Sequence, residues 1–84
     1  MKYNKKNVLI TGASKGIGAQ IAKNLASYGL KVWINYRSKI EEAETIKEQI
    51  EKAGGTAAII KADVSIEEQF IAAIKTIIES DGEL

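Results

Sequence analysis

A glycine-rich turn between a short apolar run and a helical pattern is the part of this sequence best suited to chemistry. It reads Thr11-Gly12-Ala13-Ser14-Lys15-Gly16-Ile17-Gly18 and follows Val8-Leu9-Ile10. Gly12 permits a tight exit from a strand, and Gly16 lacks a Cβ where backbone would approach a ligand. Backbone N–H groups at a helix N-terminus attract an anion, and Lys15 adds positive charge. The turn therefore predicts a binding site for the pyrophosphate of a dinucleotide.

The spacing of the glycines separates this turn from two common phosphate-binding motifs. Gly-x-x-x-Gly-x-Gly is not the usual dinucleotide fingerprint, and Ile17 replaces the Lys of a nucleoside-triphosphate loop. Ser14 contributes a hydroxyl, and Gly18 is expected to let helix and strand pack closely. A purely structural turn is the alternative interpretation, and the flanking strand and helix favour the ligand-binding one.

Strand and helix patterns alternate along the whole chain with short connections. Apolar, β-branched and aromatic runs predict strands over 6–11, 32–36 and 56–61, and helical spacing predicts helices over about 17–28, 40–53 and 66–80. Right-handed crossovers between such elements give a parallel sheet with helices on its faces and ligands beyond the carboxyl ends of its strands. The expected fold class is α/β, a Rossmann-type βαβαβα half with strand order 3-2-1.

The helices carry apolar stripes and cap signals. The first stripe contains Ile17, Ile21, Leu25 and Tyr28, widened by alanines, with Gly29 as the residue that ends the helix. Capping boxes beginning at Ser38 and Ser65 are expected to start the second and third helices, and Gly54-Gly55 is expected to end the second. The inner face of the second helix is expected to contain Ile40, Ala43, Ile46, Ile50 and Ala53, and that of the third Ile66, Phe70, Ala73, Ile74, Ile77 and Ile78.

Composition indicates one globular domain over residues 1–84. The chain is 45% hydrophobic and 27% charged and contains no Cys, His or Pro, so thiolate and imidazole chemistry are excluded. No apolar run approaches the roughly 18 residues of a membrane span, and a cytoplasmic protein without a membrane partner is the simplest interpretation. Residues 1–40 carry eight basic and no acidic residues, a charge of +8, whereas residues 41–84 carry four basic and eleven acidic residues, a charge of −7. Nucleic-acid binding through the basic half is the weakest hypothesis, since no recognition motif accompanies it.

The octapeptide from Thr11 to Gly18 resembles the cofactor-binding signature of the short-chain dehydrogenases/reductases, which are nicotinamide-dependent oxidoreductases. Within this family, residues 7–18, Asn35-Tyr36-Arg37-Ser38 and Ala62-Asp63-Val64 resemble bacterial 3-oxoacyl-[acyl-carrier-protein] reductases of fatty-acid biosynthesis. The resemblance implies NADPH-dependent reduction of a 3-oxoacyl-carrier-protein substrate by the parent protein. This chain would supply the cofactor-binding half, and a relative with another ketone or alcohol substrate is the alternative.

The end of the second expected strand bears on the choice of cofactor. Fingerprint proteins that prefer NAD use an acidic residue there, which would repel the 2′-phosphate of NADP. Here Tyr36 is followed by Arg37 and Ser38, which suit a phosphate, and Lys15 stands where many NADP-using relatives carry a basic residue. NADP(H) is therefore the expected cofactor. Solvated cations at Lys15 and Arg37, and a purely capping role for Ser38, are the alternatives.

Asp63 and Val64 follow the third expected strand and resemble the adenine site of the family. In that interpretation the Asp63 side chain accepts a hydrogen bond from the adenine amino group, and Val64 supplies backbone contact and an apolar wall. The alternative is that Asp63 only helps Ser65 to satisfy the first backbone N–H groups of the next helix.

No catalytic residue is assigned in this chain. The family's reaction uses a Tyr with a Lys four residues later, assisted by Ser and Asn, and Tyr3, Tyr28 and Tyr36 are followed at that spacing by Asn7, Val32 and Ile40. The last residues, from Asp81 to Leu84, resemble the approach to a fourth strand. The chain is thus expected to be a reductase truncated before that strand and inactive alone.

An open first strand would leave an apolar sheet edge, so self-association is expected. A non-catalytic nucleotide-binding or assembly module is the alternative function.

Overall fold

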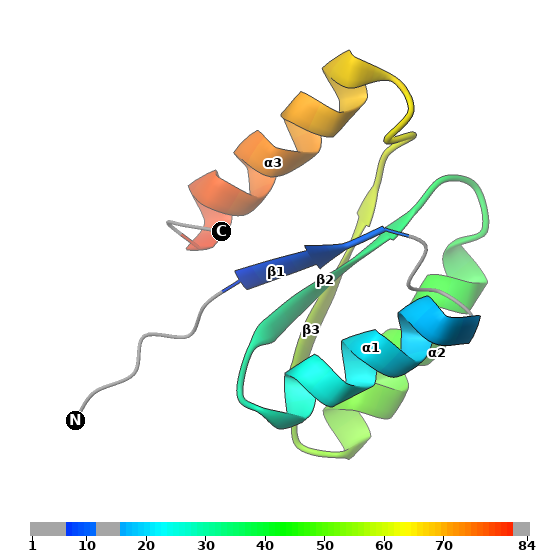
Figure 1. Ribbon diagram of the computed structural model, residues 1–84, viewed down its shortest axis with the longest axis vertical. Coiled ribbons are helices and arrows are strands. Elements are labelled where there is room, and N and C mark those ends of the chain that lie inside the picture. Colours follow the sequence, from blue (N-terminus) through cyan, green and yellow to red (C-terminus); the bar gives the residue numbers. More distant parts are fainter. Residues whose placement is uncertain (1–6, 12–15, 82–84) are drawn as a thin grey trace.

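Strands and helices alternate along the chain in a computed structural model that describes residues 7–11 and 16–81 (Figure 1). The order βαβαβα matches the order predicted from the sequence. The elements are β1 (Asn7–Ile10), α1 (Gly16–Ser27), β2 (Lys31–Tyr36), α2 (Ile40–Lys52), β3 (Thr56–Lys61) and α3 (Glu67–Asp81).

The strands form a parallel sheet in the order β1-β2-β3, which is the predicted 3-2-1 arrangement. β2 lies at its centre. Asn7 of β1 is aligned with Lys31 of β2, and the β2–β3 ladder runs from Lys31 opposite Thr56 to Tyr36 opposite Lys61. Because all strands run the same way, the turns that follow them emerge at one edge of the sheet.

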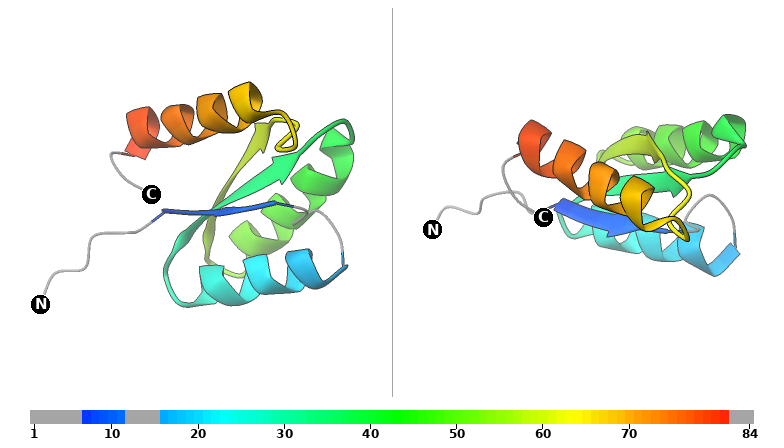
Figure 2. Two further views of the ribbon diagram at one scale, coloured as in Figure 1. Left: turned by 45° about the horizontal axis from the view of Figure 1, so that its top comes forward. Right: turned by 90° about the horizontal axis from the view of Figure 1, so that it is seen from above.

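Two helices cover one face of the sheet, and the third lies on the other. α1 and α2 lie together on one side of the strands, with α3 on the opposite side (Figures 1 and 2). Alternate residues of the strands supply the two faces. The face under α1 and α2 holds the main core, in which Val32 and Ile34 of β2 are fully buried against Ala22, Ala43 and Ile50.

The inward face of α1 consists of alanines, so the predicted stripe is confirmed at its alanines and wrong for most of its large residues. Ala19, Ala22 and Ala26 are buried, whereas Ile17 and Tyr28 are each 81% exposed. The bulky side chains of β2 already fill the space beneath this helix, so small residues opposite them allow close packing. Of the predicted stripe, Ala22 and Ala26 belong to this core and Leu25 packs against it, whereas Ile17, Ile21 and Tyr28 are exposed.

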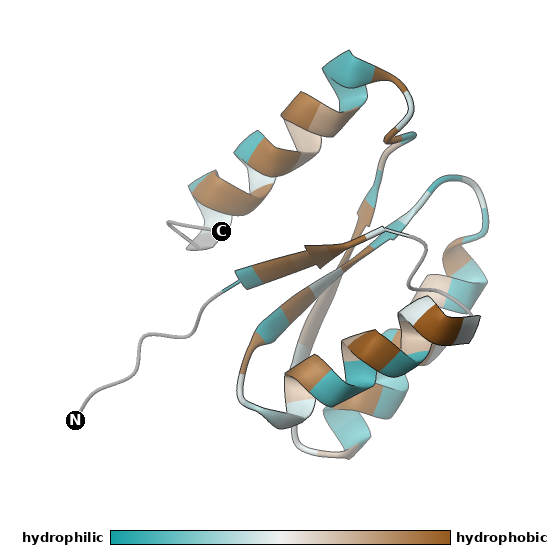
Figure 3. Cartoon of the chain, in the orientation of Figure 1, coloured by the Kyte–Doolittle hydropathy of each residue, from teal (hydrophilic) through white to brown (hydrophobic). Residues whose placement is uncertain are grey.

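The other helices bury the middle of their predicted stripes. In α2, Ala43, Ile46 and Ile50 are buried, whereas Ile40 at its first residue is exposed. In α3, Ala73 and Ile77 are buried and Ile74 is half-buried. The remaining large apolar residues of that segment, Ile66, Phe70, Ile71 and Ile78, are exposed. Figure 3 shows the apolar residues distributed along α3 and β1.

Glycines end the first two helices as expected. Gly29 and Gly54 have φ values of +90° and +91°, in the left-handed region that glycine adopts without strain. After α2, the Gly54 N–H donates to the Glu51 carbonyl at 3.0 Å and the Gly55 N–H to the Ile50 carbonyl at 2.9 Å. This is the Schellman pattern, which satisfies carbonyl groups of the last helical turn.

The predicted capping boxes are wrong. The residue that precedes α2 is Lys39, without a side-chain capping bond, so Ser38 lies one residue outside the cap position. The Ser65 hydroxyl instead donates to Asp63 at 2.6 Å, and α3 begins two residues later at Glu67. In both segments the local sequence matched the motif, but the helix began one or two residues further along.

Among the described residues, no helix has the combination of length and hydrophobicity needed to cross a bilayer.

Candidate functional site

The carboxyl edge of the sheet gathers the described part of the predicted site. α1 starts at Gly16 beyond β1, the turn at 37–39 follows β2, and the turn at 62–66 follows β3. Parallel pairing places all three at the same edge. The predicted contacts of the glycine turn at Gly12, Ala13, Ser14 and Lys15 lie outside the described residues.

Gly16 begins α1 in a conformation that favours glycine. Its φ is +64°, and a Cβ at this position would have no heavy atom within 4 Å. Glycine is therefore required by backbone conformation, and open space lies beside it. Ile17 is exposed, and Gly18 is half-buried within the first turn of the helix. These three residues place the amino end of α1, with its backbone N–H groups, at the carboxyl edge of the sheet.

Tyr36, Arg37 and Ser38, the residues at the end of β2 that bear on the choice of cofactor, differ in their surroundings. Tyr36 is half-buried and packs against the core beneath α1 and α2, and its carbonyl oxygen accepts the Ala62 N–H at 3.0 Å. Arg37 and Ser38 follow it and are exposed. Because Lys39 rather than Ser38 is at the N-cap position of α2, the purely capping role considered for Ser38 is not supported.

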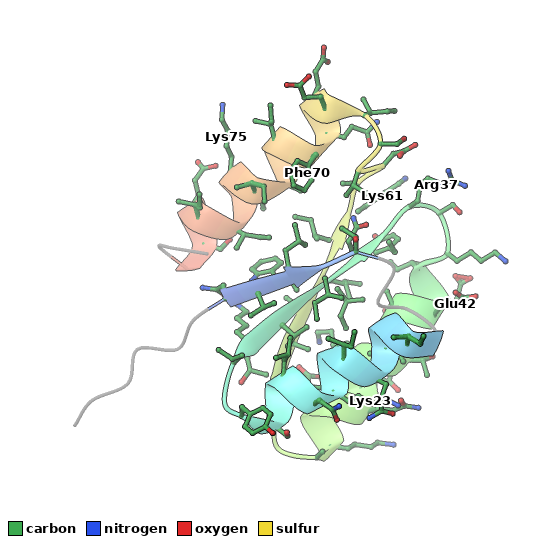
Figure 4. The ribbon with its side chains drawn as sticks, in the orientation of Figure 1. Lys23, Arg37, Glu42, Lys61, Phe70 and Lys75 are labelled. Atoms are coloured by element: carbon green, nitrogen blue, oxygen red, sulfur yellow. The ribbon has the colours of Figure 1, made fainter. Side chains whose placement is uncertain are left out.

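Lys61 is a second cation at this edge, and the sequence reasoning missed it. It is exposed at the end of β3 and aligned with Tyr36, the residue before Arg37. Figure 4 shows Lys61 and Arg37 at the same end of the two strands. Two positive side chains on neighbouring strand ends raise the local potential for a phosphate. Only the β2–β3 register reveals this proximity.

Asp63 lies immediately beyond β3 and is held by the turn that leads to α3. Its Oδ1 accepts the Ser65 N–H at 3.0 Å and the Ser65 hydroxyl at 2.6 Å, while its own N–H donates to the Gln69 side chain at 2.7 Å. These Ser65 hydrogen bonds hold the pKa of Asp63 below its ordinary value of 3.8, and the positive charge of Arg37 adds to the effect. The ionised carboxylate is thus favoured, and it faces the field of Arg37.

Asn35 is a buried polar residue that the sequence reasoning left without a role. Its side chain is 6% exposed, and Nδ2 donates to the Ala62 carbonyl at 3.0 Å and to the Ile60 carbonyl at 3.4 Å. A polar residue inside an otherwise apolar strand was the available signal. Its partners could not be read from the sequence, because they depend on the alignment of β2 with β3.

A cavity of about 250 Å³ lies elsewhere, between the carboxyl ends of α1 and α2. Ala26, Ile50 and Gly55 are among its lining residues. Each of these helices leads into the amino end of the next strand, so this cavity is at the opposite edge of the sheet. Within the described parts of the chain, no group of His, Cys, Asp or Glu side chains is placed to hold a metal ion. The candidate site is the carboxyl edge of the sheet, where the exposed Arg37 and Lys61 and the amino end of α1 suit an anionic ligand.

Curated proteins with similar sequences are oxidoreductases. The chain is 48% identical over 60 residues to 3beta-hydroxysteroid dehydrogenase 1 of Eggerthella lenta, covering 71% of this chain and 23% of that protein. It is 42% identical over 83 residues to an uncharacterized oxidoreductase of Methylorubrum extorquens, covering 99% and 34%. Identity to trihydroxynaphthalene reductase of Colletotrichum orbiculare is 44% over 66 residues, covering 79% and 23%. The chain thus spans between about a quarter and a third of the length of these relatives.

Solved structures agree. A metagenomic short-chain oxidoreductase in complex with NADP superposes with a TM-score of 0.87 at 32% identity, covering 92% of this chain and 34% of that one. A dehydrogenase/reductase from Sinorhizobium meliloti gives the same TM-score at 42% identity, covering 92% and 31%. The family model for short chain dehydrogenases matches residues 6–84. The chain therefore belongs to the short-chain dehydrogenase family.

Proposed function

We propose that this chain forms the NADP(H)-binding half of an NADPH-dependent reductase. The observation that carries the proposal is the pair of exposed cations, Arg37 and Lys61, at the adjacent carboxyl ends of β2 and β3. The position that is acidic in NAD-preferring fingerprint proteins is Tyr36. The similarity to a solved family member that is bound to NADP supports the same cofactor.

Each described residue of the edge has a binding role in this proposal. The amino end of α1, from Gly16 to Gly18, faces the pyrophosphate with backbone N–H groups. Arg37, Ser38 and Lys61 hold the 2′-phosphate through charge-assisted hydrogen bonds.

At the adenine end, Asp63 accepts a hydrogen bond from the adenine amino group, since a carboxylate has acceptor capacity beyond its bonds to Ser65. Val64, 36% exposed beside it, supplies an apolar wall. Ile17, exposed at the start of α1, adds apolar contact area at the same edge. When bound, NADPH supplies the hydride, and these residues bind and orient it.

We further propose that the parent protein reduces a 3-oxoacyl-[acyl-carrier-protein] to the 3-hydroxyacyl form in fatty-acid biosynthesis. This finer assignment rests on the resemblance of residues 7–18, 35–38 and 62–64 to such reductases. Another member of the family with a different ketone or alcohol substrate is the alternative, and the names of the matched hydroxysteroid dehydrogenase and trihydroxynaphthalene reductase favour carbonyl–alcohol chemistry in either case. The acyl-carrier-protein-linked substrate is accordingly the proposed partner.

Calorimetry with NADPH and NADH tests the cofactor assignment. We expect NADPH to bind more tightly than NADH. Arg37→Asp should lower the ratio of the two affinities by about ten- to a hundredfold, the range for charge-assisted hydrogen bonds. Lys75→Asp, on the exposed side of α3 and away from the edge (Figure 4), is the control for a general change of charge and should preserve the preference. Equal affinity of the original chain for both cofactors would contradict the proposal.

Ketone-dependent oxidation of NADPH tests the catalytic part. We expect the 84 residues alone to bind cofactor without turning over, because the Tyr-x-x-x-Lys arrangement of the family does not occur in them. Turnover of a 3-oxoacyl substrate by this chain would refute that expectation. A parent protein that reduces other ketones but not 3-oxoacyl thioesters would favour the alternative substrate class.

A further inference from the structure

Two asparagines are buried within the sheet, one at each end. Asn7 is 5% exposed and Asn35 is 6% exposed, and among the described residues they are the buried polar side chains. Asn7 lies at the amino end of β1, where its Oδ1 accepts the Trp33 Nε1–H at 3.0 Å. Asn35 lies next to the last residue of β2, at the edge that carries the candidate site. The chain thus contains two similarly buried asparagines, Asn35 beside the candidate site and Asn7 far from it.

Asn35 extends the connection between β2 and β3 past the end of the ladder. β3 ends at Lys61, and Asn35 Nδ2 donates to the carbonyl of the next residue, Ala62, at 3.0 Å. In return the Ala62 N–H donates to the Tyr36 carbonyl at 3.0 Å. Both polar groups of the Ala62 backbone are therefore held by consecutive residues of β2. Because Ala62 is only 4% exposed, water is a poor substitute for these partners.

The two segments joined in this way carry different parts of the proposed cofactor site. Ala62 directly precedes Asp63, and Tyr36 directly precedes Arg37. We propose that Asn35 is a positioning residue for the cofactor, which acts through Ala62 to hold Asp63 at a set distance from Arg37. This inference rests on the proposed NADP(H) site. In this role Asn35 aligns the adenine contact of Asp63 with the 2′-phosphate contact of Arg37, and itself contacts neither the adenine nor the phosphate.

The amide group is chemically suited to this position. Its two N–H donors can serve two carbonyl oxygens at once, those of Ala62 and Ile60. Leucine would fill similar space but leave both oxygens without this donor. An ionised carboxyl would face the same two acceptors and repel them, whereas a protonated carboxyl could donate one hydrogen bond. Substitution by Asp therefore converts the interaction into one that depends on pH.

Binding of adenosine 2′,5′-bisphosphate gives the first test, because this probe contains both the adenine and the 2′-phosphate. We expect Asn35→Leu to weaken its binding about tenfold. Asn7→Leu is the matched control, since it also removes a buried asparagine hydrogen bond, and it should lower stability while changing affinity less than about twofold. Equal loss of affinity in the two variants would overturn the proposal.

A double-mutant cycle shows whether Asn35 acts through Asp63. If it does, Asn35→Leu combined with Asp63→Ala should bind the probe no more weakly than Asp63→Ala alone. Fully additive losses would mean that Asn35 influences binding by another route, and would overturn the inference.

Amide hydrogen exchange tests the positioning without any ligand. In Asn35→Leu, exchange at Ala62 should rise about tenfold more than exchange at Ile34 in the middle of β2. A uniform rise would show a merely structural role. If the original chain fails to bind the probe, the proposed cofactor site fails, and this exchange result alone decides whether Asn35 holds the segment after β3.

Asn35→Asp supplies a variant that remains informative if the leucine variant does not fold. Burial beside two carbonyl oxygens raises the pKa of the introduced carboxyl. Protection of the Ala62 amide, taken relative to its intrinsic exchange rate at each pH, should therefore be lost near pH 8 and return toward about pH 5, whereas its protection in Asn7→Leu should show no such change. Equally low protection at both pH values would contradict the role given to the Asn35 donor.

Discussion

The carboxylate of Asp63 is bonded twice to one residue, Ser65. Oδ1 accepts the Ser65 hydroxyl at 2.6 Å and the Ser65 N–H at 3.0 Å. The two bonds close a short turn between β3 and α3, in the manner expected of an Asp that precedes a helix. They also lower the pKa of Asp63, the hydroxyl contributing most. One carboxylate thus shapes the turn, and its ionised form is favoured by Ser65 and by Arg37 at the neighbouring strand end.

We expect Ser65→Ala to raise the pKa of Asp63 toward its ordinary value of 3.8. The folded-state pKa lies below that value, so the ionised carboxylate contributes stability above about pH 4. That contribution is lost as the pH falls through the lowered pKa of the folded chain. The carboxyl carbon shift of Asp63, followed by NMR against pH, measures the change. Ser27→Ala is the control, because it removes a distant exposed hydroxyl bonded to the Asn24 carbonyl, and it should leave the Asp63 titration unchanged. An equal shift of the Asp63 pKa in both variants would contradict this prediction.

The order of elements could be predicted because each strand is marked by consecutive apolar residues, as in Val32-Trp33-Ile34. The orientation of α1 could not. Helical spacing groups Ile17 and Ile21 with Ala22 in one apolar stripe, but the sheet packs against the alanine edge of that stripe, which permits closer approach. Helix starts also differed from the motifs, since a capping box does not specify which residue first adopts helical geometry.

Some positions in the candidate site could likewise be predicted from the sequence, and others could not. The placement of Arg37 and Asp63 at one edge could be predicted because residues that directly follow parallel strands meet there. The positions of Lys61 and Asn35 relative to these residues could not be predicted, because they depend on the register between β2 and β3. That register places Lys61 next to Tyr36 and brings the Asn35 amide to the carbonyl of Ala62. Such pairings are determined by tertiary packing and have no local signal in the chain.

Gly55 should tolerate no side chain. A Cβ there would lie 2.8 Å from Ile50 Cγ2 and 3.1 Å from the Ala26 Cβ, in the contact between α1 and α2. We expect Gly55→Ala to destabilise the chain by about 1–3 kcal/mol, as for overpacked cores. Denaturant unfolding measures the loss. Ala53→Ser, an exposed change in the same turn, should stay within about 0.5 kcal/mol of the original chain. A stable Gly55→Ala variant would show that α1 and α2 can separate without cost.

Lys61 should contribute to NADPH binding through its charge. It is exposed, so we expect Lys61→Gln to weaken NADPH binding only about three- to fivefold, the range of a partly solvated ion pair. The effect should shrink as salt is added, because exposed charges are screened. Titrations with NADPH and NADH at two salt concentrations measure this. Lys75→Gln on α3 is the control, and equal effects of the two substitutions, or an equal loss for NADH, would exclude a specific role for Lys61.

Self-association should use the surface of β1 and α3. β1 lies at one end of the β1-β2-β3 order, with β2 as its neighbour in the described sheet, and Phe70 and Ile78 of α3 are 39% and 43% exposed. Strand edges and grouped apolar side chains both favour association. We therefore expect sedimentation to show a dimer or larger species whose proportion rises with concentration.

Phe70→Glu should shift that equilibrium toward the monomer, because a carboxylate would have to be buried in the contact. Thr76→Glu places the same charge on an exposed position of the same helix. It should shift the association equilibrium less, since Thr76 is not one of the exposed apolar residues of α3. Circular dichroism confirms that both variants keep the fold. A monomer at every concentration, or equal shifts by the two variants, would show that α3 and the β1 edge do not form the contact.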